Sequence, residues 1–144
     1  MASAADGAAR VVLVTNSADP DSQRIAEYYA LRRGVPVENI ISLEMPKQET
    51  ITWREFVLTV WQPLQDELVN RGWIDSVAMS LHDEYGRRKM AFSGHNMSYL
   101  IVCRGVPLRI KNDPSLVTKV KGMPDNPQMR TNRSSVDSEL SLLA

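Results

Sequence analysis

A short apolar run that ends in a thiol, a guanidinium and a glycine constrains the fold more than any other segment. Residues 98–103 read Ser-Tyr-Leu-Ile-Val-Cys, and Arg104 and Gly105 follow directly. A continuous apolar run of this length is typical of a strand buried on both faces, as in a parallel sheet packed between helices. Ligands of such sheets gather at the carboxyl ends of the strands. The sequence therefore predicts a site around Cys103, Arg104 and Gly105.

Two earlier segments have the same character and predict the rest of the sheet. Residues 10–16 and 39–43 are apolar runs, and a helix is expected between them. Asp19 is expected to cap this helix, Pro20 suits its first turn, and Gly34 ends it. The resulting β-α-β unit should be right-handed. We therefore expect a three-layer α/β domain with a mainly parallel sheet, whose strands have the order 2-1-3.

Two helices are expected to cover the sheet. The apolar stripe of the first consists of Ile25, Ala26, Tyr29 and Ala30. The second begins at a capping box formed by Thr52 and Glu55 and runs to Gly72, with a kink or two abutting pieces at Pro63. Its stripe facing the sheet consists of Phe56, Val57, Val60, Trp61, Leu64 and Leu68.

The rest of the chain is expected to be less regular. Asp75 is interpreted as the cap of a short helix that Gly86 closes, with Val77, Leu81 and Tyr85 on one face. The basic run 87–89 is interpreted as a solvated turn, and Ser93-Gly94 as a turn before the strand at 98. Leu108 and Ile110 predict a half-exposed extended segment. Serine hydroxyls at 134–135 are expected to cap a last helix.

The length of the chain and the sequence at its two ends limit the domains that it can form. The 144 residues allow one domain, expected at 10–144 with a long loop at about 112–133. Residues 1–9 are small and unpatterned, and are expected to be disordered. A last helix that stops within its first turns rarely buries enough to be stable, so the domain is expected to be incomplete at the C-terminus and the chain to be the front part of a longer protein.

Charge excludes two classes of partner. The chain has 17 Lys and Arg against 17 Asp and Glu, so no overall field attracts nucleic acid or a membrane surface. No apolar run approaches the ~20 residues that span a bilayer. Positive charge is nevertheless concentrated in 104–133, which is either an anion-binding segment or a solvated loop. Its basic residues are Arg104, Arg109, Lys111, Lys119, Lys121, Arg130 and Arg133.

The residues at the predicted strand ends suit a small anionic or carbohydrate ligand. Loop amides at a helix N-terminus bind phosphate or carboxylate groups. No Gly-rich phosphate-binding motif is present, so neither a nucleotide nor another cofactor is expected. The residues predicted to bind the ligand are Asn16, Ser17, Asp19, Ser22, Arg104 and Gly105.

The sequence also leaves two other kinds of site open, a catalytic cysteine and a cation site. Cys103 is a weak candidate nucleophile, because a thiolate needs positive neighbours and usually a histidine base. His95 is expected at the opposite end of the strand, His82 lies in the predicted helix, and packing in the core is the simpler role for Cys103. Weak candidate ligands for a hard cation are Asp19, Asp137 and Glu139, although each has a role at a helix start.

Several segments together resemble an uncharacterised family of bacterial proteins. The segments are 11–22, 25–29, 32–36, 99–110 and 135–140. Members of that family are hypothetical proteins, commonly exported, from bacteria that often carry the PEP-CTERM sorting system, and they are longer than this chain. The resemblance implies export and favours Ala2, Ser3 and Ala4 as the remnant of a signal peptide. It supplies no activity and no catalytic residue.

Two functions follow from these observations. The first is an exported binding or scaffolding module, in the periplasm or at the cell surface, with an anion or carbohydrate site at the strand carboxyl ends. The second is a hydrolase-like enzyme whose active site is completed by further C-terminal residues. A cytoplasmic location is the alternative to export.

Overall fold

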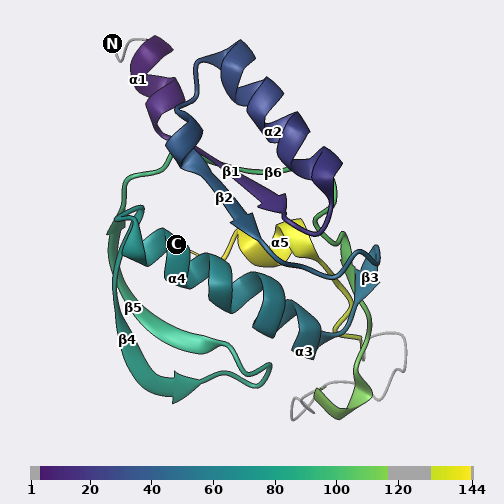
Figure 1. Ribbon diagram of the computed structural model, residues 1–144. Coiled ribbons are helices and arrows are strands. Elements are labelled where there is room, and N and C mark those ends of the chain that lie inside the picture. Colours follow the sequence, from purple (N-terminus) through teal and green to yellow (C-terminus); the bar gives the residue numbers. More distant parts are fainter. Residues whose placement is uncertain (1–3, 117–130, 144) are drawn as a thin grey trace.

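A three-stranded parallel sheet forms the centre of the structure, a computed structural model that describes residues 4–116 and 131–143 (Figure 1). Its strands are β1 (Val11–Asn16), β2 (Ile40–Leu43) and β6 (Tyr99–Val102), in the order β2-β1-β6. Both pairings are parallel, with Leu13 of β1 opposite Ile40 and Ile101. The predicted parallel sheet and its strand order are confirmed.

Helices cover the two faces of this sheet, as expected for three layers (Figure 1). Alternate side chains of a strand point to opposite faces. Val11 and Leu13 of β1 pack with the small residues Ala26 and Ala30 of α2 (Pro20–Arg33). The opposite face of β1 belongs to the larger core, which includes Val12, Val14, Ile41, Phe56, Val60, Leu64 and Leu68.

The first helix, α2, begins and ends as its sequence predicts. The Asp19 side chain caps it by accepting a hydrogen bond from the Asp21 amide, and Gly34 ends it with a φ of 67°. Its apolar stripe differs from the prediction at one position, because Ile25 is 42% exposed. The alanines let the helix lie close to the sheet, and Ile25 then points to the side of the helix rather than beneath it.

The second helix is continuous but changes its hydrogen bonding before Pro63. It consists of α3 (Trp53–Phe56), a wider turn η2 (Val57–Trp61) and α4 (Gln62–Asn70). Thr52 and Glu55 form the predicted capping box. In η2 the Gln62 amide donates to the Val57 carbonyl, five residues back. Proline lacks an amide hydrogen for the usual bond, and the helix accommodates it with this π-type turn.

The predicted helix at 75–86 is wrong, since this segment forms an antiparallel hairpin. Its strands are β4 (Ile74–His82) and β5 (Arg88–His95). Ser93 and Gly94 lie within β5 and do not form a turn. Val77, Met79 and Leu81 recur at every second residue, which is the period of a strand, although Val77 and Leu81 alone also fit one face of a helix. The Asp83 carboxylate accepts hydrogen bonds from two backbone amides across the hairpin turn and so fixes the turn.

A second small sheet follows the central one. It contains β3 (Thr50–Ile51), β7 (Arg109–Ile110) and β8 (Ser134–Ser135), in the order β3-β7-β8. The 3₁₀ helix η3 (Pro114–Leu116) follows β7. The last helix, α5 (Val136–Leu140), is capped by the Ser135 hydroxyl, as expected for this segment.

The ends of the predicted 112–133 loop are joined by three polar residues. The Asn132 amide donates to the Asn112 side chain, and the Asp113 amide donates to the Asn132 side chain. Residues 117–130, which include three of the basic residues of this segment, lie outside the described residues. Near the N-terminus the structure has a short helix, α1 (Ala4–Ala9), where no regular structure was expected. Alanine has the highest intrinsic helix propensity, which accounts for the difference.

Candidate functional site

The side chain of Asn16, the last residue of β1, forms hydrogen bonds with three loops at the carboxyl ends of the strands. Its Nδ2 donates to the Gly105 carbonyl at 2.8 Å and to the Pro46 carbonyl at 3.3 Å. Its Oδ1 accepts from the amides of Ala18 and Met45, at 3.0 and 3.1 Å. The side chain is fully buried, and both of its donors and its acceptor oxygen are in use. Asn16 therefore holds the site together rather than reaching a ligand.

Gly105 closes the space between the end of β6 and the start of α2. Its φ is 93°, and a Cβ built there would lie 2.7 Å from Asp19 Oδ2 and 3.2 Å from Ser22 Cβ. Ser22 is itself fully buried, and its hydroxyl accepts a hydrogen bond from the Asn16 amide at 3.0 Å. The structure thus brings the predicted site residues together, with backbone filling the space among them.

Two residues at this end of the sheet stay accessible to a ligand. Ser17 is exposed, and the Arg104 side chain is 66% exposed. Arg104 Nη1 lies 3.5 Å from Asp21 Oδ2, and Arg24 Nη1 lies 3.1 Å from Asp21 Oδ1. One carboxylate therefore orients two guanidinium groups from two separate elements.

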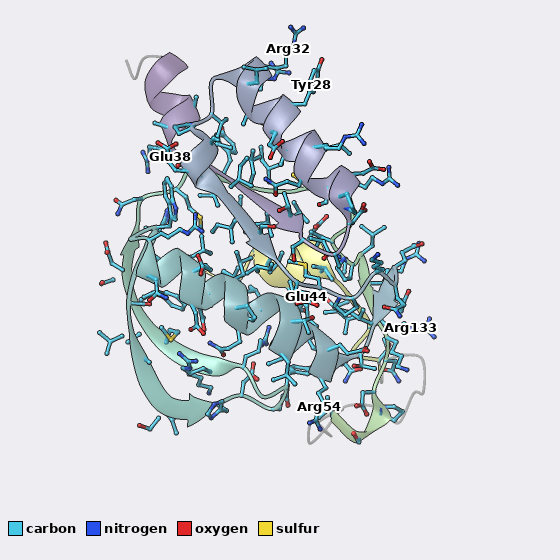
Figure 2. The ribbon with its side chains drawn as sticks, in the orientation of Figure 1. Tyr28, Arg32, Glu38, Glu44, Arg54 and Arg133 are labelled. Carbon is cyan, nitrogen blue, oxygen red and sulfur yellow. The ribbon has the colours of Figure 1, made fainter. Side chains whose placement is uncertain are left out.

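These arginines line a shallow groove that runs from the end of β6 along the outer side of α2. The groove has a volume of about 690 Å³, and its apolar lining comes from Ile25, Tyr28 and Leu31. Tyr28 is 65% exposed. Figure 2 shows Tyr28 and Arg32 pointing outward near the C-terminal end of α2, and the Arg32 guanidinium lies 5.9 Å from the centre of the Tyr28 ring.

The sequence reasoning missed the part of the site that lies on α2. It placed Ile25 in the core and gave Arg24 and Tyr28 no role. A signal was present in the spacing of Asp21, Arg24 and Tyr28, which are three and four residues apart and so share one side of a helix. Composition alone does not show that this side faces solvent.

Cys103 is a core residue in the described structure. It is 9% exposed and packs with Val11, Leu13, Ala26 and Ala30 between β1 and α2. Burial raises the pKa of its thiol above the ordinary value. His95 precedes β6 and its Nδ1 lies 2.9 Å from the Met97 carbonyl oxygen. His82 is at the end of β4, in the hairpin that lies beyond α4 on the side of the sheet away from α2 (Figure 1). The environment of Cys103 thus favours the thiol over the nucleophilic thiolate.

We predict that iodoacetamide at pH 7.5 does not alkylate Cys103 in the folded protein but alkylates it in 8 M urea, as measured by intact mass. The raised pKa of the thiol also predicts how the free energy of unfolding changes with pH. Unfolded thiols ionise above ~8.5, so the free energy of unfolding is expected to fall as the pH rises past that value. Alkylation of the native protein at the rate of a free thiol would contradict the assignment of Cys103 to the core.

The candidate cation ligands do not form a cluster. Within residues 4–116 and 131–143 there is no group of three or more His, Cys, Asp or Glu side chains placed to hold a metal ion. Glu139 is half-buried and pairs with Arg87 at 2.7 Å, and it also accepts a hydrogen bond from Ser134. Asp19 serves as the cap of α2.

Comparison with models of known protein families, with curated proteins and with solved structures finds no match to this chain. Among the described helices, none combines the length and the apolar character needed to cross a bilayer. The function is therefore argued from the geometry of the site.

Proposed function

We propose that this protein is a binding module for a carboxylated saccharide, which lies in the groove along α2 beside the end of β6. The observation that carries the proposal is the pair of exposed guanidinium groups that Asp21 holds together. Each guanidinium has five N–H donors, so one shared carboxylate leaves most of them free. Arg24, Arg104 and Asp21 together carry one net positive charge, which Glu27, the fourth charged residue of the lining, balances over the groove as a whole.

The rest of the groove supports a sugar rather than a small inorganic anion. Asp21 and Tyr28 are seven residues apart, which is about 10 Å along a helix. The exposed ring of Tyr28 offers an apolar face with a polar tip, suited to packing against a sugar ring. Glu27 also lines the groove, and it accepts a hydrogen bond from Gln23 at 2.9 Å. A ligand with a carboxylate near Arg104 and a ring near Tyr28 fits this arrangement.

The proposal predicts that the groove prefers a charged saccharide to a neutral one and that this preference depends on Arg104. By titration calorimetry, trigalacturonate is expected to bind at least ~10-fold more tightly than the neutral trisaccharide maltotriose. The Arg104→Gln variant is expected to lose about 5- to 10-fold in affinity for trigalacturonate, a modest effect because the group is exposed.

The matched control is Arg54→Gln, which removes the same charge from the exposed part of α3 (Figure 2). Its affinity should stay within ~2-fold of the parent protein. Equal binding of the charged and neutral trisaccharides, or equal losses in the two variants, would reject the proposal.

A second candidate function, self-association in a scaffold, is favoured by β6, whose outer edge pairs with no further strand in the part of the chain that the structure describes. The amides of Tyr99 and Cys103 donate to carbonyls of residue 10 and β1, so the backbone groups of Leu100 and Val102 point away from the sheet. Tyr99 is 66% exposed. By contrast, Arg71 Nη1 donates to the carbonyls of Glu38 and Ile40 beside β2. A second copy could pair edge to edge with β6.

This candidate predicts a dimer in sedimentation velocity at concentrations up to ~0.5 mM. Tyr99→Lys places charge on the pairing edge and is expected to shift the protein to monomer. Val37→Lys, at another exposed apolar position, is the control. A monomer at every concentration would leave saccharide binding as the only function proposed.

Two further expectations from the sequence concern location and catalysis. Export to the periplasm or cell surface depends on the family resemblance, and fractionation of cells that produce the protein from its own gene tests it. The hydrolase alternative loses its candidate nucleophile, since Cys103 is buried among apolar side chains. We therefore place binding ahead of catalysis.

A further inference from the structure

A separate cavity lies at the small β3-β7-β8 sheet, away from the groove along α2. Its volume is about 680 Å³, within the usual range of small-molecule pockets. Three cationic residues line it, Arg109 and Lys111 from β7 and the residue after it, and Arg133 from just before β8. No carboxylate belongs to the wall that the described residues form. The composition of the wall therefore favours an anionic ligand.

The pairing of the small sheet places polar side chains together on its outer face. Ile51 and Ile110 are buried in the core, and alternate residues of a strand point to opposite faces. Thr50, Arg109 and Ser135 lie side by side across the three strands, in the row next to these isoleucines. All three are exposed, so this row faces outward.

The same register brings Lys111 and Arg133 opposite each other. Beyond the two strands the chains stay together, because the Asn132 amide donates to the Asn112 side chain at 2.9 Å. Lys111 and Arg133 precede and follow these asparagines on the two chains, and both are exposed on the face that carries Arg109. Like charges opposite each other on neighbouring strands are destabilising. An anion bound between them would remove this repulsion.

Neither Lys111 nor Arg133 has a carboxylate within ion-pair distance among residues 4–116 and 131–143. Arg87 of the hairpin is the contrasting case. Its guanidinium pairs with Asp83 at 2.6 Å and with Glu139 at 2.7 Å, and its side chain is 15% exposed. The interpretation of the basic run as a solvated turn is thus wrong for Arg87. At the cavity, by comparison, two cations keep their donors available to a ligand.

Three carboxylates lie near the cations without lining the cavity. Arg109 pairs with Glu49 at 3.1 Å, and since both side chains are more than half exposed the pair contributes little. Glu55 and Asp113 attract Lys111 through space, and the oxygens of each accept hydrogen bonds from residues two or three positions away. The charges of the whole region balance, but those that touch the cavity are positive.

We propose that this cavity binds a dianionic oxyanion, a phosphate or sulfate group that is either free or the monoester of a small molecule. Such a group has enough oxygens to accept charge-assisted hydrogen bonds from Lys111, Arg133 and Arg109 together, which a single carboxylate does not. The Thr50 hydroxyl and the Asn112 side-chain amide line the same cavity and can donate to it. The site is separate from the saccharide groove and does not depend on it.

The test is a titration of the protein with sulfate, inorganic phosphate, glycerol 3-phosphate and acetate at pH 7.5 and constant ionic strength, followed by backbone ¹H–¹⁵N spectra. The dianions are expected to bind with a Kd of about 1 mM or tighter, and acetate at least ~10-fold more weakly. The amides of Lys111 and Arg133 should shift, while those of Arg24 and Tyr28 in the α2 groove stay in place. Tighter binding of glycerol 3-phosphate than of phosphate would identify the ligand as an ester, and the reverse order as the free ion.

Variants then locate the site. Lys111→Gln and Arg133→Gln are each expected to weaken sulfate binding at least ~5-fold, and both positions are exposed, so the fold should tolerate the changes. The control is Arg32→Gln, which removes the same charge from α2 at a position far from Arg133 (Figure 2) and should stay within ~2-fold of the parent protein. Acetate binding as tight as that of sulfate, unmoved Lys111 and Arg133 amides at 10-fold the expected Kd, or an equal loss in Arg32→Gln would each overturn the assignment.

Discussion

Gly105→Ala is expected to destabilise the protein by about 3–5 kcal/mol. Two costs combine at this position. A φ of 93° is one that residues with a Cβ rarely adopt, and the new Cβ would lie 2.7 Å from Asp19 Oδ2. Asp19 caps α2 and cannot move away without losing that cap. Urea unfolding measures the change in the free energy of unfolding.

Gly72→Ala separates the two costs. Gly72 also has a positive φ, 73°, but nothing lies within 4 Å of a Cβ built there. Only the backbone cost applies, so we expect a loss of about 1–2 kcal/mol. Equal losses at the two glycines would show that the end of β6 does not press against the start of α2.

Asn16→Ala is expected to cost a similar amount, about 3–5 kcal/mol, because it leaves four buried or partly buried backbone groups without their partner. The carbonyls of Pro46 and Gly105 lose a donor, and the amides of Ala18 and Met45 lose an acceptor. The hydrogen bond to Met45 is buried and the other three are partly buried, so water can replace the lost partner only in part.

The control for Asn16 is Asn70→Ala, at an exposed position at the end of α4. Its free energy of unfolding should change by less than ~0.5 kcal/mol. A change in the m-value for Asn16→Ala would indicate that the loops open before the sheet unfolds. A stability within ~1 kcal/mol of the parent protein would contradict the role given to the Asn16 amide.

Apolar runs and cap residues predicted the central sheet because each is a local signal. The runs around Leu13, Ile41 and Ile101 contain few polar residues. In a small domain, a strand of this composition is buried most readily in a sheet that helices cover on both faces. The caps at Asp19 and Thr52 depend on groups within three residues along the chain. These parts of the fold were accessible from the sequence.

Three features depend on contacts that a single sequence does not display. Val77 and Leu81 have a spacing that fits one face of a helix, while the intervening Met79 fits a strand, and the prediction chose the wrong period. β6 has the composition of a strand buried on both faces, but Tyr99 is exposed at the sheet edge where the predicted order 2-1-3 places this strand. Asn16 was correctly placed near Gly105, but only the structure shows that its side chain is fully paired.

The central claim is that the strand ends are closed internally, so that ligand contacts lie outside them, on α2 and at Arg104. Backbone ¹H–¹⁵N spectra recorded during a titration with trigalacturonate test it most directly. We predict shifts that cluster at Arg24, Tyr28 and Arg104, with the Asn16 and Ser22 amides unmoved. Shifts centred on Asn16 and Ser22, or none at saturating trisaccharide, would contradict the account.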